Sequence, residues 1–335
     1  MLNNLFNPGV SVIIVTYNGK SRLTQTLNHL ALQEGIAFPW EIILVDNNSN
    51  DGTAQVARNE WLNKIMDVPF SVILEKRPGT MYARYTGIVS SNFRYLLFVD
   101  DDNWLSENYV NTAYELIRKD EGIAALGGRG TMEFEKGYNP PYWVANYEMS
   151  YGCGPQGKHD GDTTFDQGWL YTAGAILDRV WLDRLYTAGF KSALTGRDGR
   201  NLAPGEDSEL TYGLKIIGGR LHYSSSLSFK HFMPNNRITW DYLKKLWFAT
   251  GQVDFTLLPY AAFWSRMGFL FYAKNLVSLG KNILLNVYFR IRTGSADGNH
   301  NTLMLLRHMG QLQSYFVRPN GFLKAYKTVR ALSVK

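Results

Sequence analysis

Two apolar segments in the first third of the chain each stop abruptly at aspartate. Residues 41–45 lead into Asp46, and residues 95–99 lead into the three aspartates at residues 100–102. Short apolar runs bounded by turn residues are typical of buried parallel strands. Ligands of open α/β sheets bind at the carboxyl ends of such strands, so we expect these carboxylates to share one crevice.

The segments around these two runs alternate between strand and helix patterns. Apolar runs predict strands at residues 10–15, 41–45, 70–74, 95–99, 170–177 and 220–229. Helical spacing and capping residues predict helices at residues 21–33, 51–64, 81–90, 179–188 and 208–217. This alternation predicts an α/β fold with a mainly parallel sheet flanked by helices. Residues 127–167, rich in Gly, Tyr, Pro and Trp, are expected to form an irregular excursion over the site.

Charge is unevenly distributed along the 335 residues. Residues 1–229 hold 20 Lys and Arg against 26 Asp and Glu, a net charge of −6. Residues 230–335 hold 15 against three, a net charge of +12. From about residue 238 the pattern is helical and aromatic, so we expect a first domain at residues 1–237 and a basic helical extension at residues 238–335. A basic segment joined to an acidic body favours an anionic partner.

Cysteine usage and the N-terminus bear on the cellular compartment. Cys153 is the single cysteine, so no disulfide can form within the chain, which fits a reducing compartment. The first residues lack the basic region of a signal peptide, and none is expected. The expected location is cytoplasmic, either free or peripheral on the cytoplasmic face of the membrane.

The three consecutive aspartates at residues 100–102 repel one another unless a cation compensates their charge. Clustered carboxylate oxygens suit Mg²⁺ or Mn²⁺, and a divalent ion beside a strand end can hold a diphosphate. A plain loop or a helix cap is the alternative interpretation. The apolar strand that precedes the cluster favours a binding site.

Four sequence blocks, taken in order, resemble family 2 glycosyltransferases with the GT-A fold. They are SVIIVTYN at residues 11–18, ILVDNNSNDG at residues 43–52, FVDDD at residues 98–102 and GEDSEL at residues 205–210. Their order carries more weight than any single block. The resemblance implies a Rossmann-like sheet, a nucleotide-diphosphate-sugar donor, a Mn²⁺ or Mg²⁺ cofactor, a hydroxyl acceptor and inversion at the anomeric carbon.

The resemblance assigns the nucleotide to residues near the ends of the first four predicted strands. These residues are Thr16, Tyr17, Asn18, Asp46, Asn48, Gly79, Arg84, Asp100 and Asp101. An aromatic ring can stack on a base, a carboxylate can accept hydrogen bonds from a base or ribose, and an Arg can bind phosphate through two nitrogens. The alternatives are a buried turn at Tyr17, a turn cap at Asp46 and an Arg84 that only neutralises the aspartates.

The same resemblance supplies a metal ligand and a general base. Asp102 matches the metal-binding position of the DxD signature, and His231 follows the last predicted strand, where an imidazole can bind Mn²⁺ or donate to phosphate. Asp207 matches the residue that removes the proton of the acceptor hydroxyl. The alternatives are a structural His231 and an acidic helix start at residues 206–207, which the helix dipole also favours.

Acceptor contacts are expected from the variable middle of the chain and from the residue before the predicted base. Trp143 and Trp169 offer aromatic faces that suit sugar rings, and Gly174 allows an acceptor to approach the backbone closely. Glu206 adjoins the predicted base. The alternatives are an aromatic core of a loop-rich subdomain and a tightly packed strand at Gly174.

The C-terminal extension mixes aromatic residues with spaced Lys and Arg. Residues 261–292 are apolar and aromatic with basic interruptions, a composition that fits helices lying on an anionic membrane surface. No run reaches the ~18 uncharged apolar residues of a spanning helix. Packing on the catalytic domain is an equal alternative, and nucleic acid is not expected as a partner. The expected acceptor is a glycan or lipid-linked glycan in bacterial polysaccharide or glycolipid assembly.

Two other functions are compatible with an acidic α/β crevice. A sugar-phosphate nucleotidyltransferase would carry a Gly-rich basic loop after its first strand, where this chain has Thr16 to Gly19. A non-catalytic nucleotide- or glycan-binding module would lack the metal ligand or the base, whereas Asp102 and Asp207 are both present. A Rossmann dehydrogenase is excluded because no G-x-G-x-x-G motif follows the first strand.

Overall fold

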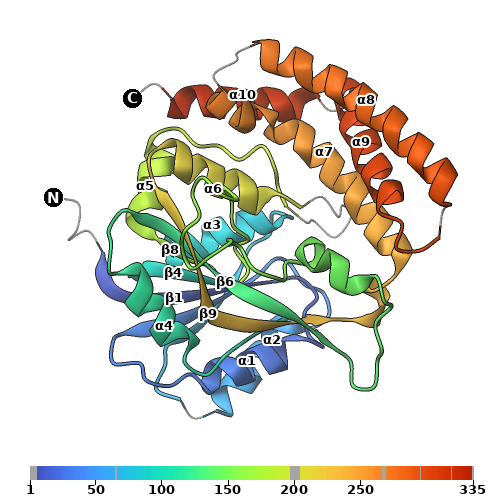
Figure 1. Cartoon of the computed structure of the whole chain (residues 1–335). Helices are drawn as coiled ribbons and strands as arrows, with labels where there is room; N and C mark the ends of the chain where they lie inside the picture. Colours follow the sequence, from blue (N-terminus) through green and yellow to red (C-terminus); the bar gives the residue numbers. More distant parts are fainter. Residues whose placement is uncertain are drawn as a thin grey trace.

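A β-sheet with helices on both faces forms the body of the molecule, and a layer of C-terminal helices covers one end of it (Figure 1). The computed structural model describes residues 6–64, 66–196, 204–265, 269–294, 296–317 and 319–333. The described strands form one nine-stranded sheet in the order β3-β2-β1-β4-β8-β6-β9-β5, with β7 paired to β9.

The N-terminal half of the sheet is parallel, as predicted. Its strands are β1 (Asn7–Thr16), β2 (Trp40–Asp46), β3 (Phe70–Leu74) and β4 (Phe93–Asp100). In register, Thr16 lies beside Asp46, and Val15 lies beside Asp100. The carboxyl ends of these strands therefore meet at one edge of the sheet, as the two aspartate-terminated runs predict.

The second half of the sheet is mixed rather than parallel. It contains β5 (Asn103–Leu105), β6 (Ile123–Phe134), β7 (Gly161–Asp162), β8 (Ile176–Asp178) and β9 (Arg220–Met233). Strand β8 is antiparallel to β4 and β6, whereas β6 and β9 run parallel. Strand β5 pairs with residues 229–231, near the C-terminal end of β9, and this pairing places Asn103 opposite His231.

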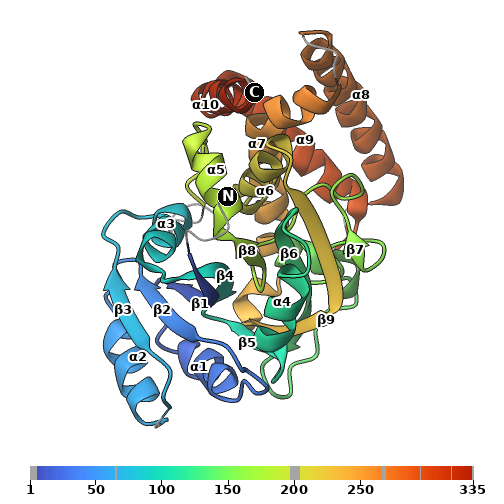
Figure 2. The same cartoon turned by 90° about the vertical axis from the view of Figure 1, so that its left-hand side faces the viewer.

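Helices cover both faces of the sheet (Figure 2). One face carries α1 (Leu23–Ala31), α2 (Thr53–Leu62) and α4 (Tyr109–Ile117), and the other carries α3 (Thr80–Ser90), α5 (Arg179–Thr187) and α6 (Glu206–Ile216). Adjacent residues of β1 separate the two cores: Val12 and Ile14 pack toward α1, and Ile13 packs on the opposite face. Burial on both faces explains why β1 is apolar without alternation.

Several predicted boundaries differ from the structure. The last strand, predicted at residues 220–229, extends to Met233 as β9, so His231 lies within it rather than after it. The strand predicted at residues 170–177 shortens to β8, because Gly174 adopts φ +69° and its N–H donates to the carbonyl of Phe98 outside a regular ladder. Residues 123–134, whose second half lies in the predicted irregular excursion, form β6 instead. Residues 144–151 of that excursion form a 3₁₀ segment, η1 (Val144–Tyr151).

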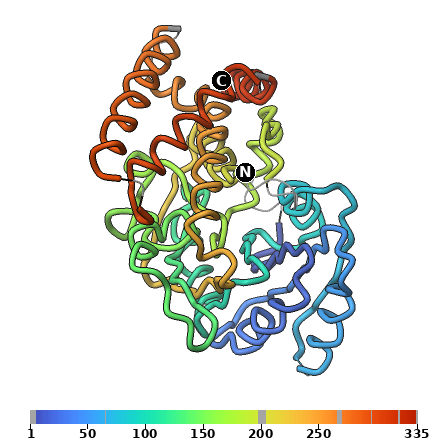
Figure 3. The backbone as a smooth tube through the Cα atoms, turned by 90° about the vertical axis from the view of Figure 1, so that its right-hand side faces the viewer, coloured from blue at the N-terminus to red at the C-terminus, as the bar shows by residue number. Residues whose placement is uncertain are grey.

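The C-terminal helices pack directly on the body. They are α7 (Trp240–Ser265), α8 (Phe269–Thr293), α9 (His300–Val317) and α10 (Pro319–Leu332), preceded by the 3₁₀ turn η2 (Asn235–Arg237). Trp240 and Leu303 share a core with Trp143 and Tyr151, and Tyr260 of α7 packs with Val329 of α10. Helices α7 and α9 lie side by side, and α8 lies outside them (Figure 3).

Packing of the extension on the body, one of the two alternatives for the tail, is therefore observed. The assignment of residues 238–335 as a separate domain stays a prediction. In the described part of the chain, no helix is both long enough and apolar enough to cross a bilayer.

Candidate active site

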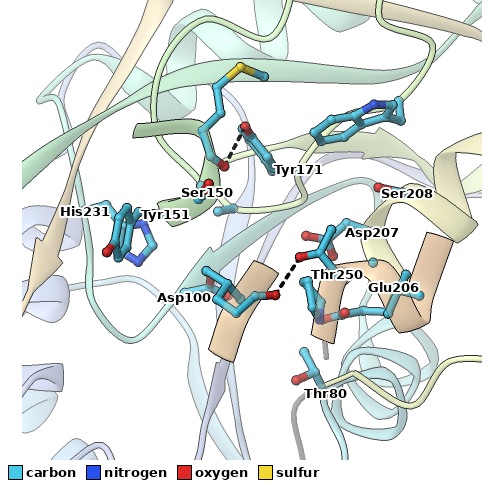
Figure 4. A pocket seen from close by; sticks show the side chains of 18 of the residues that line it. Thr80, Asp100, Ser150, Tyr151, Tyr171, Glu206, Asp207, Ser208, His231 and Thr250 are labelled. Carbon is cyan, nitrogen blue, oxygen red and sulfur yellow. Dashed lines mark hydrogen bonds between the residues drawn. The ribbon is translucent and has the colours of Figure 1, made fainter. Parts of the chain in front are cut away.

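A cavity of about 750 Å³ opens where the carboxyl ends of β1 and β4 meet the C-terminal helices. Asp100, Glu206, Asp207 and Thr250 lie around this space, with His231 and Tyr151 nearby (Figure 4). The cavity walls come from both halves of the chain. Sequence reasoning places most of the carboxylates here but does not anticipate the wall that α7 and α9 supply.

Arg84 is the cation around which three of the carboxylates gather. Its side chain is 5% exposed, and its guanidinium forms an ion pair with Asp207 and lies 3.7 Å from Glu206 and 4.0 Å from Asp100. Burial opposes the charge of Arg84, but the pKa of the guanidinium is raised by Asp207, Glu206 and Asp100 together. Arg84 therefore neutralises the acidic cluster, one of the two roles considered for it.

Asp207 projects into the cavity from the first turn of α6. Its side chain is 22% exposed, and Oδ1 accepts hydrogen bonds from Arg84 and from the hydroxyl of Thr172 at 2.6 Å. Gly205, at φ +111°, precedes α6, whose first turn contains Glu206, Asp207 and Glu209. Acidic residues at a helix N-terminus are stabilised by the helix dipole, so the helix start and a role in chemistry are compatible.

Asp101 is held by contacts within the protein. Its two carboxylate oxygens accept from Arg22 at 3.0 and 2.9 Å, and Oδ2 also accepts from the hydroxyl of Thr16 at 2.6 Å. The side chain of Asp101 is 8% exposed, and both Asp101 and Arg22 line the cavity. This arrangement fixes the loop after β4 against β1 and places Arg22 at the cavity wall. Nucleotide binding by Asp101 and Thr16 stays a prediction.

Asp102 and His231 form a buried pair at the junction of β5 and β9. Nε2 of His231 lies 3.2 Å from Oδ1 of Asp102, and Nη1 of Arg237 lies 3.2 Å from Oδ2. Burial opposes the charged forms, yet Asp102 raises the pKa of His231 to about 10, and His231 and Arg237 hold the pKa of Asp102 well below its usual range. The raised pKa favours the protonated form of His231, and a metal that binds its nitrogen must displace that proton.

Asp100 occupies the end of β4, between this pair and Arg84. Burial raises the pKa of Asp100 to about 6, with repulsion from Asp102 adding to the shift and Arg84 opposing it. A cation bound beside Asp100 would counter this shift, because an opposite charge favours the ionised carboxylate.

The donor atoms at Asp102 and His231 fit a divalent ion such as Mn²⁺. A carboxylate oxygen and an imidazole nitrogen, 3.2 Å apart, are both ligand types that Mn²⁺ accepts. Within the described ranges no group of three His, Cys, Asp or Glu side chains forms a metal cage. The arrangement suits an ion that takes one or two protein ligands and completes its shell with phosphate oxygens and water.

The residues predicted after β2 form a compact turn. Oδ1 of Asp46 accepts from the N–H of Ser49 at 2.9 Å, and Asn18 donates its N–H to Ser49 and accepts from Asn50. Asn48 is exposed at φ +65°. Asp46 is 5% exposed and is absent from the described cavity lining. Its hydrogen bond to Ser49 is the contact that the turn-cap interpretation requires. The nucleotide roles of Asp46, Asn18 and Asn48 stay predictions.

Tyr17 and Asn47 are the residues of these strand ends that reach the cavity. The ring of Tyr17 is 47% exposed rather than buried. Asn47, which is not among the predicted site residues, accepts from the N–H of Gly79 at 2.9 Å and donates to the carbonyl of Arg77 at 2.7 Å. Gly79 has φ +126°, and a Cβ there would lie 2.8 Å from the carbonyl oxygen of Thr195.

The predicted acceptor residues separate into two groups. Trp169 and Glu206 line the cavity. Trp143 is buried at 3% exposure in the core shared with α7, and Gly174 packs so tightly that a Cβ would lie 2.7 Å from the hydroxyl of Tyr109. Core packing, the alternative considered for these two residues, accounts for their positions, and acceptor binding by them stays untested.

Several cavity residues were not anticipated from the sequence. Beyond Arg22, Asn47 and Arg237, the α7–α9 wall contributes Tyr242, Leu246, Trp247, Thr250, Asp254 and Arg307. Asp254 and Arg307 form an ion pair, with Arg307 nitrogens at 2.6 and 3.0 Å from the carboxylate oxygens. The aromatic and basic character of residues 238–335 is the available signal, and it favours packing on the body or a membrane surface equally without indicating a wall of the cavity.

The chain is similar to known proteins in sequence and in fold. The family model described as glycosyl transferase family 2 matches residues 11–172. Glycosyltransferase AglE of Haloferax volcanii is 30% identical over 130 residues, which are 39% of this chain and 42% of that relative. Succinoglycan biosynthesis protein ExoM of Rhizobium meliloti is 25% identical over 251 residues, 74% of this chain and 75% of that protein.

One solved structure covers nearly the whole chain. Mannosyltransferase PcManGT from Pyrobaculum calidifontis, in complex with GDP-Man and Mn²⁺, has a TM-score of 0.57 at 16% identity and covers 99% of this chain and 87% of that one. At this identity the likeness establishes the shared fold alone. The chain spans less than half the length of each of the first curated relatives it matches. Residues 11–172 of the chain thus match glycosyl transferase family 2, with AglE as a glycosyltransferase relative over part of the chain's length.

Proposed function

We propose that this protein is a metal-dependent, inverting glycosyltransferase that moves a sugar from a nucleotide-diphosphate-sugar to a hydroxyl acceptor. The observation that carries the proposal is the convergence of Asp100, Asp102 and Asp207 around one cavity of about 750 Å³. The relatives named for glycosyl transfer and for succinoglycan biosynthesis support the reaction class and polysaccharide or glycolipid assembly as its setting.

The donor would lie across the carboxyl ends of β1 and β4. Tyr17 offers an exposed ring for the base, and Arg22 offers a guanidinium at the cavity wall for the diphosphate. Asp102 and His231 would hold the divalent ion, which acts as a Lewis acid when bound. Because Asp101 is fixed by Thr16 and Arg22, the strand-end loop keeps Asp102 in place without the donor.

Asp207 would act as the general base. Its carboxylate takes the proton of the acceptor hydroxyl as the hydroxyl oxygen bonds to the anomeric carbon and the bond to the diphosphate breaks. Attack from the side opposite the diphosphate inverts the configuration at that carbon. Thr172 and Arg84 hold Oδ1 of Asp207 by hydrogen bonds, which orients the carboxylate toward the cavity.

The acceptor would lie between Asp207 and the wall formed by α7 and α9. Trp169, Tyr242 and Trp247 present aromatic surface to this side of the cavity, and the Asp254–Arg307 pair presents polar groups. Flat aromatic rings with nearby hydrogen-bonding groups suit a carbohydrate. A glycan or lipid-linked glycan fits this wall.

A nucleotide panel tests the proposal. Nucleoside diphosphates and nucleotide-sugars are added with and without Mn²⁺, and the melting temperature is recorded, because a ligand that binds the native state raises it. The donor so identified is then incubated with candidate glycans. Release of a nucleoside diphosphate with a product of inverted configuration is expected. A parallel reaction supplies a nucleoside triphosphate and a sugar 1-phosphate, and release of pyrophosphate there would indicate a nucleotidyltransferase instead. Binding without turnover of any acceptor would favour a binding module.

A further inference from the structure

Helix α8 presents a row of large apolar side chains to solvent. Leu270, Val277, Leu284, Tyr288 and Ile291 are 63, 75, 73, 49 and 78% exposed. Successive members are seven, seven, four and three residues apart, a spacing that keeps them on one side of a helix with 3.6 residues per turn. We call this row the apolar stripe.

The opposite side of α8 is fixed against α9. Leu279 is 2% exposed, and Oδ1 of Asn275 accepts hydrogen bonds from Gln311 at 3.2 Å and from Tyr315 at 2.9 Å. The orientation of α8 about its own axis is therefore set by contacts with α9. Among the elements described, α8 lies at the outside of the C-terminal layer (Figures 1 and 3), and the five residues of its apolar stripe are exposed.

A row of basic residues runs beside the apolar stripe. Lys274, Lys281 and Arg292 are exposed, and on the helical wheel they follow the stripe by less than half a turn. The sequence of α8 contains no Asp or Glu, so no acidic side chain of the helix offsets these charges. A second hollow of about 300 Å³ adjoins the stripe, lined by Val287, Arg290, Ile291, Gly294 and Leu305.

We propose that the outer face of α8 binds the surface of an anionic lipid membrane. Aliphatic side chains enter the boundary between head groups and acyl chains, while the adjacent Lys and Arg contact anionic head groups. At 1.5 Å per residue the helix is about 37 Å long, enough for all five apolar residues to lie along the membrane plane. The inference stands independently of the transfer reaction.

Charge and side-chain type decide between this partner and two others. A second copy packed stripe to stripe would cover the apolar residues but would offer the basic row no acidic partner from α8, because α8 contains no Asp or Glu. Nucleic acid would use the basic row but would leave the aliphatic stripe exposed to water. An anionic membrane satisfies both features with one surface.

Vesicle sedimentation tests the proposal with the full chain. Vesicles of phosphatidylcholine alone and of phosphatidylcholine with phosphatidylglycerol are compared at low and high salt. We expect binding to the anionic vesicles that weakens with salt, because exposed charges are screened. The triple variants Val277→Gln/Leu284→Gln/Ile291→Gln and Lys274→Gln/Lys281→Gln/Arg292→Gln should each reduce that binding by about tenfold or more.

A matched control separates the α8 face from net charge. Lys119→Gln/Lys136→Gln/Lys158→Gln removes the same charge from exposed positions on the body and should bind as the wild type does. Three results would each overturn the proposal. They are a loss of binding in this control equal to that of the basic-row variant, full binding by the apolar-stripe variant, and no binding of the wild type to anionic vesicles. A wild-type dimer that the apolar-stripe variant separates would assign the face to a second copy instead.

Discussion

The side chain of Arg84 lies between the proposed donor-binding residue Asp100 and the proposed general base Asp207. It contacts Asp207 on α6 and lies 4.0 Å from Asp100 on β4, so the donor and acceptor sides share one buried cation. Thr172 adds a second donor to the same oxygen of Asp207. A base held by two donors has a fixed direction, which proton transfer from a bound hydroxyl requires.

Removal of the Thr172 hydroxyl should slow turnover without weakening donor binding. A hydrogen bond to a charged group contributes about 1.5–3 kcal/mol, so Thr172→Val is expected to lower kcat by about tenfold to a hundredfold. Thr172→Ser keeps the hydroxyl and should restore most of the rate. Steady-state kinetics with donor and acceptor varied separately check this. A drop in donor affinity that matches the drop in kcat would assign Thr172 to structure alone.

Glu75 should stabilise the fold in a pH-dependent way. Arg77 and Thr86 donate to its carboxylate and, against a smaller effect of burial, lower the pKa of Glu75 from 4.5 to about 2. A lowered carboxyl pKa contributes stability above pH 4.5, and that stability is lost as the pH falls toward 2. Glu75→Gln should therefore lower the free energy of unfolding by about 1–3 kcal/mol at neutral pH.

Urea unfolding of the Glu75→Gln variant and the wild type, at neutral pH and at about pH 3, measures this dependence. The difference in the free energy of unfolding should shrink at the lower pH. A difference that stays constant across this range would show that the carboxylate charge is not its cause.

At the scale of secondary structure, glycine determines how closely elements approach. A Cβ at Gly251 of α7 would lie 1.8 Å from the carbonyl oxygen of Arg307, and one at Gly310 of α9 would lie 2.0 Å from that of Phe248. The two helix backbones are therefore in contact where they cross. This contact fixes the wall that carries Trp247 and Arg307 into the cavity.

A methyl group at this crossing should destabilise the protein. Gly251→Ala forces α7 and α9 apart, and overpacking of this kind costs about 1–3 kcal/mol or more. Gly280→Ala in α8 is the matched control, because a Cβ there meets nothing within 4 Å and alanine favours a helix by about 1 kcal/mol. Thermal unfolding should show a lower Tm for Gly251→Ala and an equal or higher Tm for Gly280→Ala. The reverse order would contradict the close crossing.

The parallel half of the sheet was predictable because each strand is a short apolar run that ends in polar turn residues. Strand β6 was not, because Gly127, Gly128 and Gly130 suggest a loop. The structure gives the reason for one of them: a Cβ at Gly128 would lie 2.4 Å from the carbonyl oxygen of Leu227 on β9. A close approach between strands distant in sequence leaves no local periodic signal.

At the scale of the whole molecule, the extension supplies a wall of the candidate site. Asp102 and Asp207 were accessible to sequence reasoning because each sits in a local motif. Trp247, Asp254 and Arg307 were not, since their place in the cavity depends on how α7 and α9 cross and dock on the body. The basic, aromatic composition of residues 238–335 thus has two structural outcomes: an inner wall at the cavity and an outer face on α8.

The measurement that tests the central claim most directly is the turnover of Asp207→Asn, with nucleotide binding recorded on the same preparation. Asparagine keeps the shape of the side chain but cannot take the proton, so we expect turnover to fall by about 10²–10⁴-fold while the nucleotide-dependent rise in Tm remains. Asp166→Asn, at an exposed position, is the control and should leave both unchanged. Near-normal turnover by Asp207→Asn would contradict the account.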